Sequence, residues 1–372
     1  MLDRFTLSRR RLFQLGMLAG AGGLAAACAS PEGGSRGRSG GGNDQYSTIR
    51  STAISFIWAP FLVAEQKNYF AEEGLSQVGN VAGQGVVANI VIAGDADFVI
   101  GSPMDTIKST VVGQPLISFC CMVTTLATNI VITDEAFTQA GLTESSTPEE
   151  RAAAMRGLRL ASTGVASTPD LLIRYAASNL GGLDPDTDVQ ITPIQGGGSA
   201  MLAAVMNGQI DGMAISSPLS DQAIHELGMR YLFNMAEDPI RDLIGFPYIV
   251  ASCTKEFLEA NPDAIAAYCR SIQRALNFIQ AEKDEFRELL GGLFTDIDPE
   301  VYNAAFEANY PIYGRTITPT NGQFNQAKEF VINAFEINGS LTEAEATRKI
   351  TFDDAWNAAI AEEAQAEVGT SY

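Results

Sequence analysis

The distribution of apolar and polar positions predicts one series of elements that occurs twice along the chain. In the first occurrence, an extended run over 51–57 is followed by a helix over 60–70. The apolar stripe of a second helix over 86–91 leads to Gly94-Asp95-Ala96-Asp97 and then to a strand over 98–100.

The second occurrence begins about 110 residues later and keeps the same order. It comprises a strand over 158–162, a helix over 170–180, a strand over 189–194, a helix over 201–206 and a strand over 213–215. Gly208-Gln209-Ile210-Asp211 precedes its last strand, so both copies contain a G-x-x-D sequence at the same place. Each last strand also runs into a Ser-Pro pair.

Each copy is expected to form its own sheet. A strand joined to the next by a helix makes a right-handed parallel crossover, so each sheet should be mainly parallel and flanked by helices. Two sheets predict an α/β fold with two lobes. Ligands of open α/β sheets bind beyond the carboxyl ends of the strands, so the loops at those ends should line a ligand cleft between the lobes. The alternative is that such repeats occur in any α/β domain, without a two-lobed binding protein.

The lobe boundaries follow from an apolar run over 246–250, which is expected to return to the first sheet. We assign residues 46–130 and 248–372 to lobe 1, and residues 131–247 to lobe 2. Apolar stripes predict further helices over 262–281, near 302–308, and over 322–337 and 341–350. These helices are expected to complete lobe 1.

The strand-end loops supply the candidate ligand-binding residues. They are Trp58, Gly101, Ser102, Pro103, Met104, Gly164, Ser167, Thr168, Gly197, Gly198, Ser199, Ser216, Ser217 and Pro218. Glycines at helix N-termini expose backbone N–H groups that can hold an anion, hydroxyls add hydrogen bonds, and an indole can close over a flat ligand. The alternatives are N-capping for the hydroxyls at helix starts, core or hinge packing for Trp58, and strand termination for the Ser-Pro pairs.

The N-terminal segment predicts export. Arg9, Arg10 and Arg11 precede an apolar run over 12–27 that is too short to span a bilayer, so residues 1–27 are expected to be a removable signal. The arginines resemble a twin-arginine signal, with general export as the alternative. The protein is therefore expected in the periplasm or on the outer face of the cell membrane.

The residues after the signal predict a membrane anchor. Leu24 to Cys28 resembles a lipobox with its leucine one place early, which makes Cys28 the expected lipidation site. An ordinary cleaved signal followed by an incidental cysteine is the alternative. Residues 28–45 contain no large apolar side chain and predict a flexible tether between lipid and domain.

The net charge excludes one class of partner. The whole chain has a formal net charge of −20, and residues 1–27 contain four arginines and one aspartate, so removing them gives −20 − 3 = −23. Such an acidic body repels nucleic acid and anionic lipid surfaces. We therefore expect no nucleic-acid partner.

The side chains predict no catalytic residue, no metal site and no cofactor. His225 is the only histidine and lies in a helical segment, where a solvent-exposed imidazole is expected. The sequence contains no G-x-S-x-G nucleophile motif and no phosphate-binding loop. Cys120, Cys121, Cys253 and Cys269 have no C-x-x-C spacing. Buried thiols are expected, with a disulfide from Cys120 or Cys121 to Cys253 as the alternative.

Several motifs resemble the nitrate-, sulfonate- and taurine-type substrate-binding proteins of ABC importers. They are Ala59-Pro60, Ala64 to Leu75, Ala93 to Phe98, Gly208 to Asp211 and Glu259 to Asp263, and Tyr69 to Leu75 is the most specific of them. The resemblance spans residues 51–279 and implies a periplasmic-binding-protein fold of the second type, which closes about a hinge onto its ligand. The sequence departs from the family at Ser76 to Asn80, so the second strand is expected to be short.

The resemblance also implies a function. It implies a monomeric binding protein that delivers a small molecule to the permease of an ABC importer and its ATPase. The ligand stays open between an aliphatic sulfonate- or nitrate-like anion and a pyrimidine-like or other flat heterocycle. The same superfamily includes thiamine-pyrimidine synthases, which depend on histidine and a cysteine cluster that this sequence lacks. A periplasmic enzyme of that fold and a surface sensory lipoprotein are the alternative functions.

Overall fold

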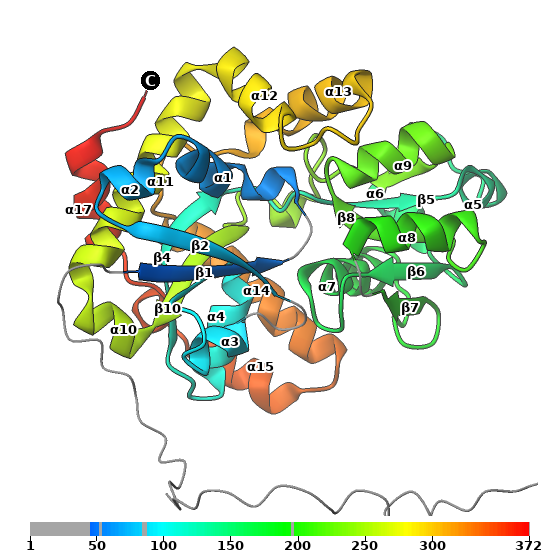
Figure 1. Cartoon of the computed structure of the whole chain (residues 1–372). Helices are drawn as coiled ribbons and strands as arrows, with labels where there is room; N and C mark the ends of the chain where they lie inside the picture. Colours follow the sequence, from blue (N-terminus) through cyan, green and yellow to red (C-terminus); the bar gives the residue numbers. More distant parts are fainter. Residues whose placement is uncertain (1–44, 52–53, 84–87, 195–196, 372) are drawn as a thin grey trace, which may run out of the picture. The chain divides into compact units, whose positions relative to one another are not determined.

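The computed structural model describes residues 45–51, 54–83, 88–194 and 197–371 (Figure 1). The predicted signal over 1–27, Cys28 and all of the predicted tether except Gln45 lie outside these residues. Export and lipidation therefore stay predictions. Among the residues that the structure describes, no helix combines the length and the apolar character needed to cross a membrane.

The first sheet has the strand order β2-β1-β3-β10-β4 within the described residues. Its strands are β1 (Gln45–Ser51), β2 (Ser76–Gly83), β3 (Phe98–Gly101), β4 (Leu116–Val123) and β10 (Ile249–Thr254). β1 pairs with β2 and with β3 in parallel, whereas β10 is antiparallel to both β3 and β4. β10 alone thus runs against the other strands of this sheet.

The second sheet has the equivalent order, β7-β6-β8-β5-β9. Its strands are β5 (Thr128–Ile132), β6 (Arg159–Ser162), β7 (Gln190–Pro193), β8 (Gly212–Ser216) and β9 (Arg230–Phe233). Here β5 is the strand that runs against the others. The predicted duplication and the two-lobed α/β fold with mainly parallel sheets are confirmed.

The antiparallel strand of each sheet comes from a crossing of the chain between the lobes. Residues 124–127 lead from β4 into β5, and residues 234–248 lead from β9 back into β10. β5 begins at Thr128, three residues before the predicted start of lobe 2 at 131. These two crossing segments are two covalent connections between the lobes, and segments of this kind can act as a hinge.

Helices cover both faces of each sheet. In the first lobe, α1 (Ala59–Gln66) and α11 (Pro262–Ala281) lie on one face, and α3 (Ala88–Ile92) and α4 (Pro103–Val111) lie on the other (Figure 1). In the second lobe, α8 (Gly197–Met206) and α9 (Leu219–Leu227) pack on the face that presents Val131 and Met213. The opposite face packs against α6 (Pro148–Ala153) and α7 (Thr168–Tyr175).

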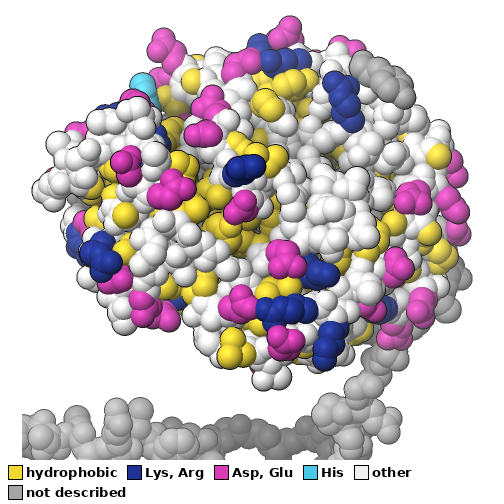
Figure 2. Space-filling view, turned by 180° about the vertical axis from the view of Figure 1, so that it is seen from behind, with side chains coloured by type: hydrophobic (Ala, Val, Ile, Leu, Met, Phe, Trp, Pro, Cys, Tyr) yellow, Lys and Arg dark blue, Asp and Glu magenta, His cyan; other side chains and the backbone are white. Residues whose placement is uncertain are grey.

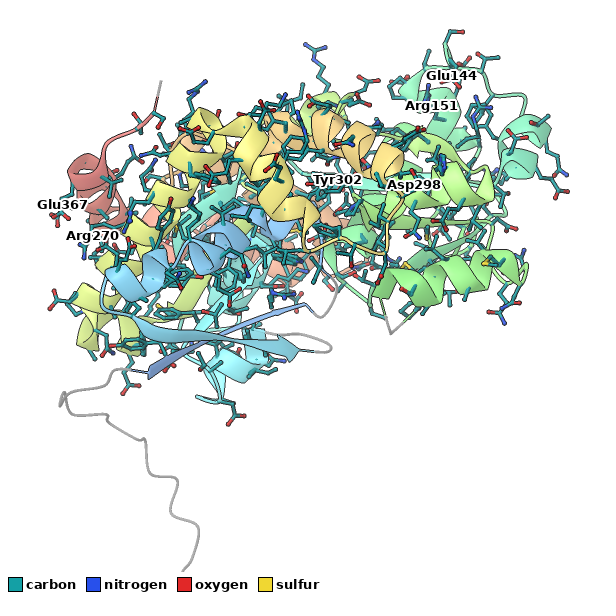
Figure 3. All side chains as sticks on the ribbon, turned by 45° about the horizontal axis from the view of Figure 1, so that its top comes forward. Glu144, Arg151, Arg270, Asp298, Tyr302 and Glu367 are labelled. Atoms are coloured by element: carbon teal, nitrogen blue, oxygen red, sulfur yellow. The ribbon has the colours of Figure 1, made fainter. Side chains whose placement is uncertain are left out.

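The remaining helices belong mostly to the C-terminal part of the chain. They are α2 (Tyr69–Glu72), α5 (Asp134–Gln139), α10 (Lys255–Ala260), α12 (Lys283–Gly291), α13 (Pro299–Asn309), α14 (Asn321–Ile337), α15 (Leu341–Arg348), α16 (Phe352–Ala355) and α17 (Ala359–Val368). Arg270 of α11 joins Glu73, which follows α2, at 2.6 Å and Glu367 of α17 at 3.2 Å (Figure 3). The last helix, for which the sequence predicted no element, is therefore held against α11.

The two G-x-x-D sequences close the start of each sheet in the same way. Asp97 accepts a hydrogen bond from the backbone N–H of Ser47 in β1 at 2.8 Å, and Asp211 accepts one from the backbone N–H of Arg159 in β6 at 2.8 Å. The glycine of each sequence, Gly94 or Gly208, has a positive φ and ends the preceding helix. The repeated aspartate thus ties the loop after a helix to the first strand of its sheet.

The strand predicted over 51–57 is wrong. β1 covers Gln45–Ser51, and the apolar run that follows it forms the 3₁₀ turn η1 (Phe56–Trp58), which leads directly into α1. All three residues of η1 are buried. A short run of consecutive apolar residues has no periodicity that distinguishes a strand from a buried turn, and Pro60 favours the start of a helix here.

Two further predictions near the first lobe need correction. The helix predicted over 60–70 is divided into α1 and α2, because Asn68 adopts a left-handed φ of 58°. β2 is eight residues long rather than short. Its long parallel pairing with β1 shows that hydrogen bonds to a neighbouring strand decided its extent.

The cysteines are free thiols. Cys120, Cys121, Cys253 and Cys269 are all buried and none forms a disulfide in the described part of the chain. In the pairing of β4 with β10, Cys120 lies opposite Ala251 and Cys253 lies opposite Ile117. The buried-thiol interpretation is confirmed, and the alternative disulfide to Cys253 is not formed.

Candidate functional site

The end of β3 forms the first candidate segment. Gly101 is the last residue of β3, and Ser102 caps α4 by accepting a hydrogen bond from the N–H of Met104 at 3.3 Å. Pro103 occupies the first turn of α4, and Met104 is 1% exposed. The capping role of Ser102 is therefore real, and its half-buried hydroxyl keeps free acceptor capacity.

Trp58 lies at the end of η1 and is buried. The turn is fixed by the C-terminal part of the chain. The ring of Phe56 packs edge-on against Phe294 at 5.1 Å and against Tyr302 of α13 at 5.7 Å between ring centroids. The hydroxyl of Tyr313 also donates to the carbonyl of Phe56 at 2.9 Å. Trp58 itself belongs to the buried core, so core packing, one interpretation of this residue, is confirmed. The turn that ends at Trp58 is held through Phe56 by residues far along the chain.

Gly164, Ser167 and Thr168 form a tight turn before α7. The carbonyl of Gly164 accepts hydrogen bonds from the hydroxyl of Ser167 at 2.7 Å and from its N–H at 3.2 Å. Ser167 caps α7, and Thr168 is its first residue. Ala166 inside this turn has a φ of 57°, which is unusual for a residue with a Cβ.

Gly197, Gly198 and Ser199 form the first turn of α8. Gly197 has a φ of 75°, and a Cβ on Gly198 would overlap the side chain of Leu219. Ser199 is exposed. The two glycines are therefore required for conformation and close approach, and α8 begins next to the segment that follows Pro218.

Ser216, Ser217 and Pro218 lie at the end of β8 over a network of buried polar groups. The hydroxyl of Ser216 lies 3.3 Å from that of Thr128, which lies 2.6 Å from the hydroxyl of Tyr248. These residues stand where the two crossing segments enter β5 and β10. The end of β8 is thus coupled to the predicted hinge.

A second branch of the network supports Ser217. The amide of Asn129 donates to the hydroxyls of Ser217 at 3.4 Å and Ser220 at 3.0 Å. Asp221 accepts from Ser220 at 3.1 Å and from the hydroxyl of Tyr231 at 3.0 Å. Burial raises the pKa of Asp221, and these hydrogen bonds oppose that rise. This network was not identified from the sequence. Asn129, which stands directly before the apolar run 130–132, was a usable signal, because a buried asparagine needs hydrogen-bond partners.

Two polar contacts join the lobes beside the candidate segments. The carbonyl of Ser217 accepts hydrogen bonds from the hydroxyl of Ser55 at 2.6 Å and from the N–H of Phe56 at 3.1 Å. The ammonium of Lys108 in α4 donates to the carbonyl of Ala166 at 3.1 Å. The first contact brings Trp58 close to Ser217 in the fold, and the second brings α4 close to the turn over 164–168.

The candidate residues are all uncharged, and Lys108 and Arg174, which follow them along α4 and α7, already have partners. Lys108 engages Ala166, and Arg174 of α7 forms ion pairs with Asp170 at 3.2 Å and Asp186 at 2.6 Å. Three short segments between residues 45 and 371 are not described by the structure, namely Thr52-Ala53, Gln84 to Val87 and Gln195-Gly196. Their sequences contain no charged side chain. The candidate segments therefore offer hydroxyls, backbone groups and apolar surface.

A sequence profile of the NMT1-like family matches residues 55–292. This chain belongs to the NMT1-like family. The match covers both crossings and all candidate segments, and it confirms the resemblance to nitrate- and sulfonate-type binding proteins at the level of family and fold.

Solved structures show the same fold as this NMT1-like protein. A protein from Bordetella bronchiseptica RB50 aligns with a TM-score of 0.71 at 19% identity, over 87% of this chain and 98% of that one. The alkanesulfonate-binding protein SsuA from Xanthomonas axonopodis pv. citri, bound to MOPS, aligns at 0.64 and 14% identity, over 85% and 99%. The periplasmic nitrate-binding protein NrtA from Synechocystis PCC 6803 aligns at 0.63 and 14%, over 87% and 89%.

A curated relative is named as a bicarbonate transport ATP-binding protein, CmpC, from Synechococcus elongatus. It is 27% identical over 243 residues, which are 62% of this chain. The chain spans about a third of that relative's length, 35%.

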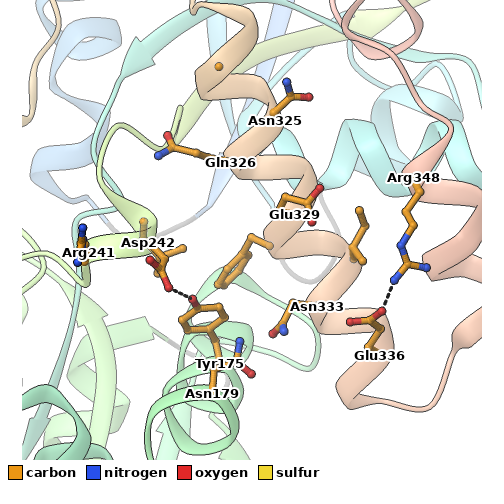
Figure 4. A pocket seen from close by; sticks show the side chains of 14 residues that line it. Tyr175, Asn179, Arg241, Asp242, Asn325, Gln326, Glu329, Asn333, Glu336 and Arg348 are labelled. Atoms are coloured by element: carbon orange, nitrogen blue, oxygen red, sulfur yellow. Dashed lines mark hydrogen bonds and ion pairs between the residues drawn. The ribbon is translucent and has the colours of Figure 1, made fainter.

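A separate cavity of ≈ 630 Å³ lies away from the candidate segments (Figure 4). Its walls come from α7 and the π-helical turn η2 (Ala176–Leu180), from the 3₁₀ turn η3 (Arg241–Leu243), and from α14 and α15. Tyr175 packs on Phe330 at 5.3 Å and donates to Asp242 at 3.4 Å, while Arg348 pairs with Glu336. This rear cavity is polar and largely open, because Asn179, Asn325 and Glu329 are exposed.

His225 is exposed on α9, and the described residues contain no group of histidine, cysteine, aspartate and glutamate side chains able to hold a metal ion. On the face shown in Figure 2, acidic side chains are spread among lysines and arginines rather than gathered in one patch.

Proposed function

We propose that this chain is the extracytoplasmic solute-binding lipoprotein of an ABC importer, which captures a small molecule between its lobes and delivers it to a membrane permease. The observation that carries the proposal is the pair of equivalent sheets whose strand-end segments touch across the lobe junction, at Ser55–Ser217 and Lys108–Ala166. Ligands of α/β sheets bind at such strand ends. Two of the structural neighbours are named as an alkanesulfonate-binding protein and a periplasmic nitrate-binding protein, and these names support the same function.

We place the ligand against the fourteen candidate residues named from the sequence. Their groups divide into three kinds: backbone N–H groups at the starts of α4, α7 and α8, hydroxyls such as those of Thr168 and Ser217, and the apolar side chains of Trp58 and Met104, which are buried in this structure. Helix N-termini and hydroxyls suit a sulfonate, nitrate or bicarbonate ion. The same groups, together with an indole and without a free cation, suit a neutral pyrimidine-like ring.

A thermal-shift screen of the full chain carrying Cys28→Ser tests this proposal. The panel contains taurine, MOPS, nitrate, bicarbonate, a pyrimidine and a flavin. A ligand at 100 times its Kd stabilises the folded state by about 2.7 kcal/mol, which raises the melting temperature by several degrees. Mass spectrometry of the incubated compound should show no conversion. A new product would favour the alternative of an enzyme with this fold.

Matched variants locate the site. Thr168→Val keeps the side-chain shape and removes one hydroxyl, so it is expected to reduce the shift caused by the hit compound. Thr347→Val makes the same change in α15, where the hydroxyl bonds the carbonyl of Glu343, and Glu329→Gln alters the rear cavity. Both are expected to leave the shift unchanged. A shift lost only in Glu329→Gln would move the binding site to the rear cavity.

Membrane attachment is the second part of the proposal. Cells expressing the chain should hold it in the membrane fraction, and Cys28→Ala should release it into the extracytoplasmic soluble fraction. Replacing Arg10 and Arg11 by lysine should block export if the twin-arginine route is used. Retention of the Cys28→Ala protein in the membrane would exclude the lipid anchor.

Partnership with a permease and ATPase is tested by uptake. Deletion of the gene should abolish import of the hit compound, while expression of the chain should restore it. A strain that imports the compound normally without this chain would favour a sensory role.

A further inference from the structure

Lys108 and Ala166 form the contact between the lobes that has a charged donor. Lys108 lies in the second turn of α4, four residues after Met104, and Ala166 lies in the turn between Gly164 and Ser167. The two elements belong to different sheets. The hydrogen bond at 3.1 Å therefore exists only when the end of β3 and the start of α7 are next to each other.

The peptide groups around Ala166 are held in the orientation that this contact needs. Ala166 adopts a left-handed φ of 57°, which is energetically unfavourable for a residue with a Cβ. Its N–H donates to Asp170 at 3.0 Å, and Asp170 is 3% exposed and also bonded to Arg174 at 3.2 Å. A strained backbone that is fixed on its N–H side presents its carbonyl in one direction, towards α4.

Charge on both sides of the junction matches the ammonium. Lys108 interacts electrostatically with Asp105 on its own helix and with Asp170 on the other lobe. Burial lowers the pKa of Lys108, and the two carboxylates oppose that shift. An ammonium that donates to a carbonyl and lies in the field of two carboxylates is poorly placed to serve as the counter-ion of a bound anion.

We propose that Lys108 is a positioning residue, which holds the turn over 164–168 against α4 and so stabilises the arrangement in which the two lobes enclose the ligand. The inference rests on the proposed binding function and adds a determinant of affinity outside the fourteen candidate residues. Because the contact is made by the protein with itself, it should strengthen binding of every ligand to a similar degree. It should not discriminate anions from neutral compounds.

The test measures the separation of the lobes without any ligand. Spin labels are attached to Met206→Cys in α8 and Leu341→Cys in α15, which are 72% and 64% exposed. The full chain carries Cys28→Ser, and its other native thiols are buried and unreactive. Pulsed dipolar spectroscopy then gives the distribution of distances between the lobes.

Lys108→Met is expected to lower the ratio of the short-distance to the long-distance population about three- to tenfold, as befits one partly exposed hydrogen bond from a charged donor. Lys108→Arg should restore the ratio, and Ala166→Gly should preserve it because the carbonyl remains. Lys328→Met is the matched control, since Lys328 donates to the carbonyl of Ile350 at 3.2 Å among the C-terminal helices only. Its distance distribution should equal that of the parent protein.

An unchanged distribution in Lys108→Met would overturn the inference. A lower melting temperature in Lys108→Met, with the same distances, would also contradict it and would leave only a structural role. The affinity of the compound found by thermal shift gives a second readout: taurine and a pyrimidine should lose the same factor, whereas loss for the anion alone would make Lys108 a ligand contact. Since the distances need no ligand, a failed compound screen would count against the proposed function but not against this contact.

Discussion

In the first lobe the residue after the G-x-x-D aspartate is Phe98, whereas in the second lobe the equivalent residue is Gly212. Both begin the strand that pairs with the first strand of the sheet, β3 or β8, and both aspartates bond the start of that neighbour. The backbone scaffold is thus the same in the two lobes. The space for a side chain at this one position differs: the first lobe holds a phenylalanine ring, whereas the second has no room for a Cβ.

The surroundings explain the difference. Phe98 packs on Tyr268 at 4.9 Å, Phe257 at 5.3 Å, Phe119 at 5.8 Å and Tyr46 at 5.9 Å between ring centroids. A Cβ on Gly212 would lie 2.5 Å from the carbonyl oxygen of Val131. The first lobe is filled by aromatic residues from α10 and α11, while the second packs its strands and short helices closely. A repeated topology therefore does not imply a repeated core.

Phe98→Ala should have the largest effect, because it removes the centre of the aromatic cluster in the first lobe. We expect a loss of about 3–5 kcal/mol in the free energy of unfolding, from lost transfer energy and the cavity left behind. Urea denaturation followed by circular dichroism measures it. Phe98→Leu should lose clearly less, and a loss below about 1 kcal/mol for Phe98→Ala would show that the cluster is not central to the first lobe.

Gly212→Ala tests the opposite situation in the second lobe. The new methyl must displace Val131 and the side chains of Ile132 and Leu160, so we expect a loss of about 1–3 kcal/mol from overpacking. The control is Gly101→Ala at the end of β3, where the nearest atom would be Asp105 Oδ2 at 3.6 Å, an ordinary contact. Equal losses in the two variants would remove the proposed difference in packing.

Ser55→Ala asks whether the lobes depend on each other at their junction. It removes the hydroxyl that donates to Ser217 but leaves the N–H of Phe56 on the same carbonyl, so about 0.5–1.5 kcal/mol should be lost. Hydrogen exchange at the amide of Phe56 should accelerate with little change elsewhere. Faster exchange throughout the second lobe would instead mean that this contact supports the entire lobe.

Asp211→Asn sharpens the comparison between the two aspartates. Asp211 bonds the guanidinium of Arg159 at 2.6 and 3.0 Å, whereas Asp97 bonds the N–H and hydroxyl of Ser47. The hydrogen bond from Arg159 lowers the pKa of Asp211. A lowered folded-state pKa adds stability at pH 7, and this stability is lost as the pH falls below the ordinary aspartate range of about 4 and passes the folded pKa.

The expected result is a small drop in melting temperature for Asp211→Asn at pH 7, which narrows towards pH 3 and in high salt. The partners of Asp97 given above include no cation, so the change in melting temperature caused by Asp97→Asn should depend less on salt. Melting curves at several pH values and salt concentrations measure both. A difference between Asp211→Asn and the parent that is constant with pH would show that the carboxylate charge at Asp211 does not matter.

Several features of the fold could be predicted from the sequence because they depend on local pattern. The α11 helix over Pro262–Ala281 agrees with its apolar stripe, and the duplicated order of elements correctly predicted two equivalent sheets. The strand predicted over 51–57 failed, since Phe56 and Ile57 form a buried turn and Phe56 packs against Tyr302 of α13. Periodicity cannot reveal burial of that kind.

The candidate segments could be placed at strand ends by their order along the chain, and their role in binding stays a prediction. The groups that sequence reasoning missed are those whose partners lie far away: Ser55 with Ser217, Lys108 with Ala166, and Asn129 with Ser220. Nothing in the sequence near Lys108 specifies a carbonyl on the other lobe. Such contacts depend on where two separate sheets stand.

By itself, then, the sequence determined the local elements, the twofold repetition and the aspartate that closes each sheet, because hydrophobic period, glycine conformation and short-range hydrogen bonds act within a few residues or one βαβ unit. Only the tertiary structure decided which strand of each sheet runs against the others, how much volume the residue at Phe98 or Gly212 can occupy, and which polar groups meet across the lobe junction. Those outcomes depend on packing and on pairing between residues that are far apart in the chain. The cost of burying a polar group depends on its hydrogen-bond partners, and the local sequence pattern does not show which distant residues these are.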